Sequence, residues 1–153
     1  MTIDETSIPT DRDRVEDAVR RARHAARWWG GLSHDDRKDW LLEFKSVVAR
    51  NSASLVDVVR EETGKPTDDA LLEVMLAVEH LTWAAKNARR VLRERSVLPG
   101  LVSANQAASV RYEPMGVVGV IGPWNYPVYT PMGSIAYSMA AGNAVVFKPS
   151  ELT

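Results

Sequence analysis

The fold is decided by residues 115–147, which carry the sequence MGVVGVIGPWNYPVYTPMGSIAYSMAAGNAVVF. Short runs rich in Val and Ile lie at Met115–Ile121 and Ala144–Phe147, and the stretch between them includes the small-residue segment Tyr129–Ala141. Short apolar runs bounded by Gly and Pro are typical of strands buried on both faces. A strand, a helix and a second strand in this order form a βαβ unit with two parallel strands. We therefore predict an α/β fold class.

The lack of Asp, Glu, Lys and Arg from Pro114 to Phe147 also raises the alternative of a membrane span. Pro123, Pro127 and Pro131 interrupt the stretch, and the segment after the last of them is shorter than the roughly 20 residues that a spanning helix needs. An interior covered on both faces, as in a parallel sheet, accounts better for the missing charges. We expect no contact with a membrane.

Four helices are predicted before this stretch, because apolar residues recur there at spacings of three and four. They are expected at Asp11 to about Trp29, after Ser33, from about Asn51–Ser54 to Gly64, and from Thr67 or Asp68 to about Arg93. Ser33 and Asp36 resemble a capping box, and Gly64 followed by Pro66 is typical of a helix end. Alternating apolar residues predict a strand over Ala107–Tyr112. Four tryptophans lie on helical faces and are expected to pack in the core: Trp28, Trp29, Trp40 and Trp83.

Composition excludes several classes of function. The chain has 153 residues, with 19 Lys and Arg against 20 Asp and Glu, for a formal net charge of −1. A dedicated nucleic-acid-binding protein usually carries a basic excess, so we expect no nucleic-acid partner. There is no Cys, which excludes a disulfide, a thiolate metal site and a cysteine nucleophile within this chain. The histidines are scattered, and no metal site is expected. The acidic, polar Met1–Thr6 segment lacks the features of a secretory signal, so a cytoplasmic location is expected.

Polar clusters follow both predicted strands. Pro123–Pro127 (PWNYP) comes after the first, and Lys148–Glu151 (KPSE) comes after the second. Ligands of open α/β sheets bind outside the carboxyl ends of the strands. Because parallel strands end at the same edge, we expect these two clusters to lie close together there.

Each cluster has a functional and a plain interpretation. The side-chain amide of Asn125 has two N–H donors and could stabilise an oxygen that becomes negative during a reaction. It could also merely cap the following helix or make a local turn. Lys148 and Glu151 could contact the ribose or phosphate of a nucleotide, since a carboxylate suits a vicinal diol. They could equally form an ordinary surface ion pair.

Two long motifs resemble the aldehyde dehydrogenase superfamily. Arg111–Pro127 (RYEPMGVVGVIGPWNYP) is similar to the first core strand and catalytic-asparagine motif of that family. Ala140–Thr153 (AAGNAVVFKPSELT) is similar to its next strand and cofactor loop. Upstream, Glu61–Pro66 (EETGKP), followed by Glu73–Val74, is also family-like. The resemblance extends over about residues 12–153, essentially the whole chain.

The resemblance implies NAD(P)+-dependent oxidation of an aldehyde to a carboxylic acid. In the family, a cysteine thiolate attacks the aldehyde, hydride passes to the nicotinamide, and a glutamate-activated water releases the acid. Asn125 would donate to the oxyanion, and Tyr126 would lie near the aldehyde tunnel. The implied cofactor-binding residues are Ile121, Gly122, Pro123, Trp124, Lys148, Pro149, Ser150 and Glu151. NAD is the expected cofactor, because a carboxylate at position 151 repels the 2′-phosphate of NADP. NADP is left open as the alternative.

The chain departs from the family in lacking the nucleophilic Cys and the catalytic domain. We therefore expect the N-terminal portion of an aldehyde dehydrogenase, inactive alone, from a parent that forms a homo-dimer or homo-tetramer. The alternatives are a nucleotide-binding or subunit-interaction module and an inert truncation product. The implied fold is Rossmann-like. The expected layout is a flexible tail at 1–10, the helical part of the cofactor-binding domain at 11–106, a strand of the oligomerisation arm at 107–114, and the first βαβ unit of the cofactor-binding domain at 115–153. The strand of the arm is expected to lack its partner strand.

Overall fold

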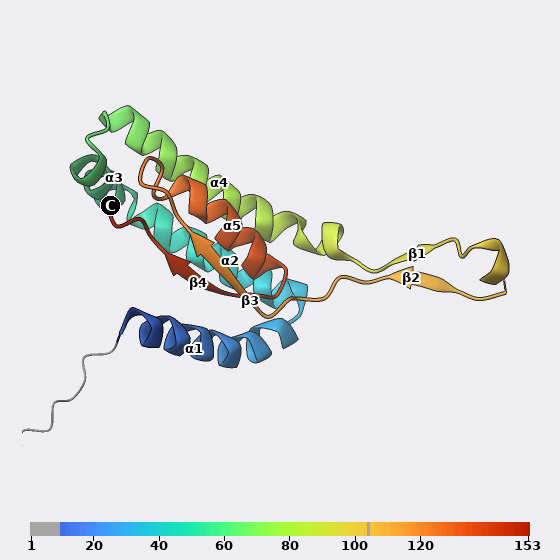
Figure 1. Ribbon diagram of the computed structural model, residues 1–153. Coiled ribbons are helices and arrows are strands. Elements are labelled where there is room, and N and C mark those ends of the chain that lie inside the picture. Colours follow the sequence, from blue (N-terminus) through green and yellow to red (C-terminus); the bar gives the residue numbers. More distant parts are fainter. Residues whose placement is uncertain (1–9, 104) are drawn as a thin grey trace, which may run out of the picture.

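The computed structural model describes residues 10–103 and 105–153, and Figure 1 labels its elements. The described chain opens with α1 (Asp11–Gly31), α2 (His34–Arg50), α3 (Ser52–Thr63) and α4 (Thr67–Leu92). These bounds confirm the four predicted helices. Of the tail predicted over residues 1–10, Thr10 alone is described, and its hydroxyl accepts from the backbone N–H of Asp13 to cap α1. The rest of that prediction lies outside the described residues.

Residues close together in the sequence determine where the helices begin and end. The Ser33 hydroxyl accepts from the backbone N–H of Asp36, and the Asp36 carboxylate accepts from that of Ser33, which confirms the capping box. Gly64 ends α3 in the left-handed conformation, with a φ of 70° that glycine adopts at little steric cost. Pro66 then precedes α4. Lys65 is thereby held at the corner between two helix ends.

The predicted βαβ unit is confirmed, and it consists of β3 (Val117–Ile121), α5 (Tyr129–Ala140) and β4 (Ala144–Lys148). The two strands pair in parallel, with Val117 opposite Ala144 and Ile121 opposite Lys148. Their carboxyl ends therefore meet at the same edge of the sheet.

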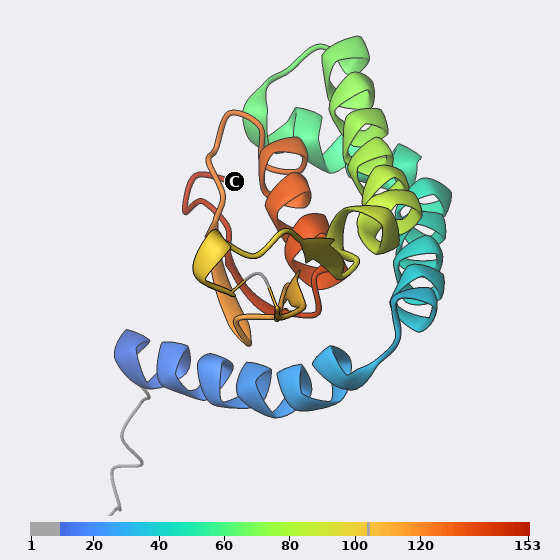
Figure 2. The same cartoon turned by 90° about the vertical axis from the view of Figure 1, so that its right-hand side faces the viewer.

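Helices lie on both sides of the strand pair, as Figures 1 and 2 show. α1 packs against β3 and β4 from one side, and α5 packs against them from the other. α4 contacts α5, α2 and α3, and so completes the helical layer. The core of this layer consists of buried aliphatic side chains: Leu41, Val48, Val56, Val59, Ala70, Val74, Leu81, Ala84, Ala85, Ala136 and Ala140. None of the described helices combines the length and the apolar character needed to cross a membrane.

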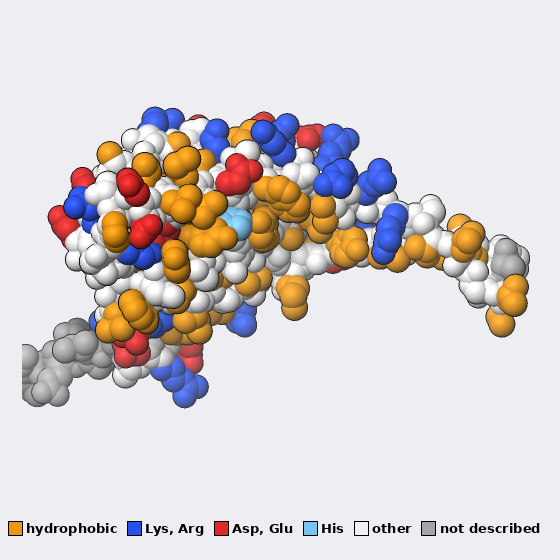
Figure 3. All heavy atoms as spheres, turned by 90° about the horizontal axis from the view of Figure 1, so that it is seen from above, with side chains coloured by type: hydrophobic (Ala, Val, Ile, Leu, Met, Phe, Trp, Pro, Cys, Tyr) orange, Lys and Arg blue, Asp and Glu red, His pale blue; other side chains and the backbone are white. Residues whose placement is uncertain are grey.

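A two-stranded arm projects away from the helical body (Figure 1). It contains β1 (Arg95–Val97), the 3-10 helix η1 (Leu101–Ser103) and β2 (Ala108–Val110), and β1 pairs antiparallel with β2. The strand predicted over residues 107–112 is confirmed by β2, but the expectation that it lacks a partner strand is wrong. β1 is too short for its alternation to be recognised, so the sequence placed it in the helical part. Apolar side chains lie along the arm to its tip (Figure 3), where three are almost fully exposed: Leu98, Leu101 and Val102.

The four helix-borne tryptophans do not share one environment. Trp29 is buried, and its Nε1 donates to the backbone carbonyl of Met139 in α5 over 2.8 Å. Trp28, Trp40 and Trp83 are 57%, 55% and 45% exposed, so their prediction as core residues is wrong. Trp28 and Trp40 instead meet edge to face at the surface, with ring centroids 6.2 Å apart. Neighbouring positions on a helix turn to different faces, and only Trp29 of these four turns to the interior.

Candidate functional site

The carboxyl ends of β3 and β4 carry the two polar clusters. The backbone N–H of Gly122, directly after β3, donates to the carbonyl of Lys148 at the end of β4 over 3.0 Å. The cluster Pro123–Pro127 continues from Gly122, and the cluster Lys148–Glu151 continues from the facing strand. The two clusters therefore leave the sheet at the same edge, as the predicted parallel pairing requires. We call this edge the rim.

The second cluster forms an exposed ion pair. Lys148 Nζ lies 2.5 Å from Glu151 Oε2, and the two side chains are 60% and 77% exposed. The hydrogen bond from Lys148 lowers the pKa of Glu151 below its ordinary value. Ser150 Oγ accepts from the backbone N–H of Leu152 and shapes the turn, while Pro149 is exposed. This contact fits the plain ion-pair interpretation, yet both charged groups stay accessible to a ligand because more than half of each side chain is exposed.

The residues at the end of β3 and directly after it that the resemblance assigned to the cofactor differ in exposure. Ile121 and Trp124 are 80% and 56% exposed, Pro123 is half-buried, and Gly122 is buried. A Cβ at Gly122 would lie 3.0 Å from Cε2 of the Phe147 ring, so the strand end is closely packed there. The rim thus offers exposed apolar side chains at the end of β3 and exposed charges at the end of β4.

Asn125 lies in the bend between β3 and α5, and its side chain is exposed. The helix-capping interpretation of Asn125 is wrong, because α5 begins after Val128 and no side chain of the loop caps it. The backbone N–H groups of Val128 and Tyr129 donate instead to Glu73 Oε1, over 2.9 and 3.1 Å. Within the described residues the Asn125 amide makes no hydrogen bond, so its two N–H donors are available to a ligand.

Sequence reasoning missed Glu73 as a residue of this region. Its side chain is completely buried in α4, and its Oε2 lies 2.5 Å from Lys65 Nζ. The Lys65 ammonium also lies 3.8 Å from the centroid of the Tyr126 ring. A signal was present in the sequence, since Glu73 lies beside Ala70 and Val74 on the apolar stripe of its helix. A carboxylate on such a stripe needs buried partners.

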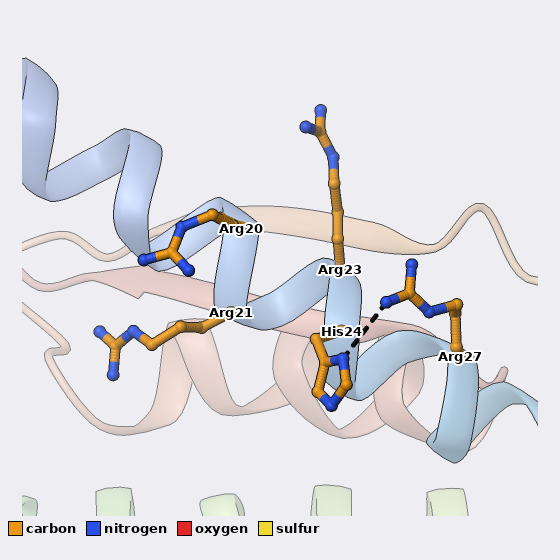
Figure 4. Close-up of a pocket in the computed structure, with 5 residues that line it drawn as sticks. All are labelled: Arg20, Arg21, Arg23, His24 and Arg27. Atoms are coloured by element: carbon orange, nitrogen blue, oxygen red, sulfur yellow. Dashed lines mark hydrogen bonds between the residues drawn. The ribbon is translucent and has the colours of Figure 1, made fainter.

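A surface depression also lies along α1 (Figure 4). Its lining consists of Arg20, Arg21, Arg23, His24 and Arg27. Arg20 and Arg21 pair with Asp17, and Arg27 Nη2 lies 3.2 Å from His24 Nδ1, the contact that Figure 4 marks with a dashed line. Four of its five side chains thus contact neighbours on the same helix, and we assign no ligand to this depression. In the part of the chain that the structure describes, no group of three or more His, Asp or Glu side chains could hold a metal ion.

Comparisons with known proteins agree on one family. The model of the aldehyde dehydrogenase family matches residues 6–153. The N-succinylglutamate 5-semialdehyde dehydrogenases of Shigella dysenteriae serotype 1 (strain Sd197) and Escherichia coli (strain K12) are each 38% identical to this chain over 144 residues. Each alignment covers 94% of this chain and 28% of the relative. The chain therefore spans little more than a quarter of the length of the curated relatives it matches.

Solved structures give the same result. An aldehyde dehydrogenase from Brucella melitensis biovar abortus 2308 superposes with a TM-score of 0.86 at 26% identity, over 92% of this chain and 28% of that one. The NADP-dependent glyceraldehyde-3-phosphate dehydrogenase from Bacillus halodurans C-125, complexed with NADP, gives a TM-score of 0.86 at 28% identity, over 93% and 30%. The helices and the parallel strand pair described above match the N-terminal part of this fold.

Proposed function

This chain belongs to the aldehyde dehydrogenase family, and from that premise we propose that it supplies part of the active site of an NAD(P)+-dependent enzyme. The reaction proposed is the oxidation of an aldehyde to a carboxylic acid. The observation that supports this proposal is the common edge from which the Asn125 cluster and the Lys148–Glu151 cluster leave the sheet. Ligands of parallel sheets bind at such an edge.

Asn125 is proposed as the donor to the oxygen that becomes negative when the aldehyde is attacked. Its exposed amide, which makes no hydrogen bond among the described residues, suits this role. A preorganised donor of this kind typically contributes about 10²–10³ in rate. Tyr126, the next residue, is proposed to lie beside the substrate, and this residue is 47% exposed.

The residues of the rim fit a nicotinamide dinucleotide. The carboxylate of Glu151 can accept hydrogen bonds from two hydroxyl groups of a ribose. The Lys148 ammonium has N–H donors beyond the one that it gives to Glu151. Ile121, Gly122, Pro123 and Trp124 are proposed to line the nicotinamide side, and Pro149 and Ser150 to shape the ribose loop. When bound, the cofactor supplies the acceptor for hydride. The negative charge of Glu151 favours NAD, and NADP is the alternative.

The 153-residue chain is proposed to be inactive alone, because it has no Cys to attack the aldehyde. An observation also favours one alternative function, that of a subunit-interaction module. The exposed apolar tip of the β1–β2 arm suits a contact with another chain, and we propose a homo-dimer or homo-tetramer for the complete enzyme.

Calorimetry with NAD+ tests the cofactor part of this proposal. We expect weak binding by the unmodified chain and weaker binding by Glu151→Ala, because that change removes the ribose acceptor. Asn125→Ala is the matched control, since its proposed partner is the aldehyde oxygen and not the ribose. Absence of heat at millimolar NAD+ would contradict nucleotide binding by this chain. Aldehyde-dependent formation of NADH by the pure chain would contradict its proposed inactivity.

A further inference from the structure

One buried carboxylate joins separate parts of the chain where α4 meets α5. Glu73 Oε1 accepts from the backbone N–H groups of Val128 and Tyr129, and Glu73 Oε2 accepts from Lys65 Nζ over 2.5 Å. The first turn of a helix leaves such N–H groups without an acceptor inside the helix, and the helix dipole favours a negative charge beside them. Glu73 therefore fixes the place where α5 begins.

Lys65 reaches the loop that precedes this helix. Its ammonium lies 3.8 Å from the ring centroid of Tyr126, which is within the range of a cation–π contact. Tyr126 directly follows Asn125, and its backbone carbonyl accepts from the N–H of Thr130. Lys65 thus holds the residue next to Asn125, while Glu73 holds the residues at the end of the same loop.

Core stability alone does not account for this charged pair. Burying two charges carries a desolvation cost that offsets most of their attraction, and well-packed apolar residues often serve a core as well or better. The neighbours of Glu73 on the same face of α4 are apolar and buried: Ala70, Val74 and Ala77. An apolar side chain at position 73 would suit this packing, but it could not accept from α5 or from Lys65.

We propose that Lys65 and Glu73 are positioning residues, which hold the loop so that the amide of Asn125 keeps one orientation. They act through Tyr126 and through the first turn of α5, and they do not touch the reacting atoms. This inference rests on the proposed function, in which Asn125 is the donor to the developing oxyanion. A donor of that kind is effective only when its orientation is set before the reaction.

Substitutions in the full 153-residue chain separate these contacts. Glu73→Gln keeps the volume of the side chain and an oxygen that can accept from the backbone N–H groups of Val128 and Tyr129. It removes the negative charge that faces Lys65. Lys65→Met keeps the aliphatic stem and removes the cation. The matched control is Glu43→Gln, which removes a charge from an exposed pair in which Arg50 Nη2 lies 3.0 Å from the carboxylate and both side chains are 63% exposed.

NMR measures the effect at the loop directly. In Glu73→Gln, we expect amide hydrogen exchange at Val128 and Tyr129 to accelerate relative to Leu41 and Val48, on the order of tenfold or more. Lys65→Met is judged by the Asn125 side-chain signals alone, because its expected loss of global stability also accelerates exchange in α2. We also expect the single set of side-chain amide signals of Asn125 to broaden or split. The control variant should change neither readout.

Either of two results would overturn the inference. One is an acceleration in Glu73→Gln that is uniform over the loop and over α2, which indicates a merely structural pair; the other is an unaltered set of Asn125 signals in both variants. Where a charge variant does not fold, Tyr126→Leu removes the cation–π contact without uncovering a buried charge, and the same broadening is expected. Failure of the unmodified chain to bind NAD+ would contradict the proposed function and leave the loop result standing. Unaltered loop signals in a chain that binds NAD+ would contradict the positioning role alone.

Discussion

Two Lys–Glu pairs in this molecule have the same N–O distance and opposite surroundings. Lys65 and Glu73 are 2.5 Å apart with 16% and 0% of their side chains exposed, whereas Lys148 and Glu151 are 2.5 Å apart with 60% and 77% exposed. Water screens the exposed pair and solvates either charge alone. The buried charges depend on each other, on their hydrogen bonds and on the contact of Lys65 with the Tyr126 ring. Burial, and not distance, therefore decides that one pair shapes the fold while the other is free to meet a ligand.

The largest expected effect is the loss of stability in Lys65→Met. This change leaves the Glu73 carboxylate buried without its cation, for which we expect a loss of about 3–5 kcal/mol in the free energy of unfolding. Lys148→Met makes the same chemical change at the rim and should leave that free energy nearly unchanged. Urea denaturation of both variants and the unmodified chain measures the difference. Equal losses would contradict the contrast between the two pairs.

A second test compares substitution of a closely packed glycine at the rim with substitution of the exposed charges there. Gly122→Ala places a Cβ 3.0 Å from the Phe147 ring and 3.5 Å from Pro131, so we expect a loss of about 1–3 kcal/mol in the free energy of unfolding. Gly119→Ala, inside β3, meets no atom within 4 Å and should lose little or nothing. Thermal or urea unfolding gives both values. A neutral Gly122→Ala would show that the Phe147 ring moves aside freely.

The smallest expected effect concerns pH at the exposed pair. The hydrogen bond from Lys148 lowers the pKa of Glu151 from its ordinary 4.5. Because the folded pKa is the lower one, the contribution of this contact is fully present above pH 4.5 and is lost as the pH falls through the folded value. An NMR titration of the Glu151 carboxyl should show the lowered pKa, and Lys148→Met should return it toward 4.5. An identical titration in both proteins would mean that the pair does not form in solution.

The strand pair and the helix ends could be predicted because their signals are local. Val- and Ile-rich runs bounded by Gly and Pro marked β3 and β4, and Gly64 before Pro66 marked a corner whose left-handed backbone suits glycine. The shared rim followed from the same pattern, since two strands joined by one helix run parallel. In each case the residues that carry the signal are close together in the chain.

The remaining features depend on partners that are distant in sequence. Nothing near Asn125 indicates that the acceptor for the following helix is Glu73, so a local cap by Asn125 was a reasonable alternative that the structure excludes. Trp28 and Trp29 occupy adjacent positions with similar apolar character, and only the packing of α1 against the rest of the chain decides that Trp29 is the buried one. Tertiary contacts, not local pattern, settle such choices.

The separation in sequence between Glu73 and its partners also sets an order of events during folding. The acceptor lies 55 residues before the amide of Val128, while Lys148 and Glu151 are only 3 residues apart. Closing the longer contact requires that α4 first dock on the nascent α5, whereas the shorter one forms as soon as its turn does. We therefore expect the loop of Asn125 to gain its final shape late, after the helical layer has assembled.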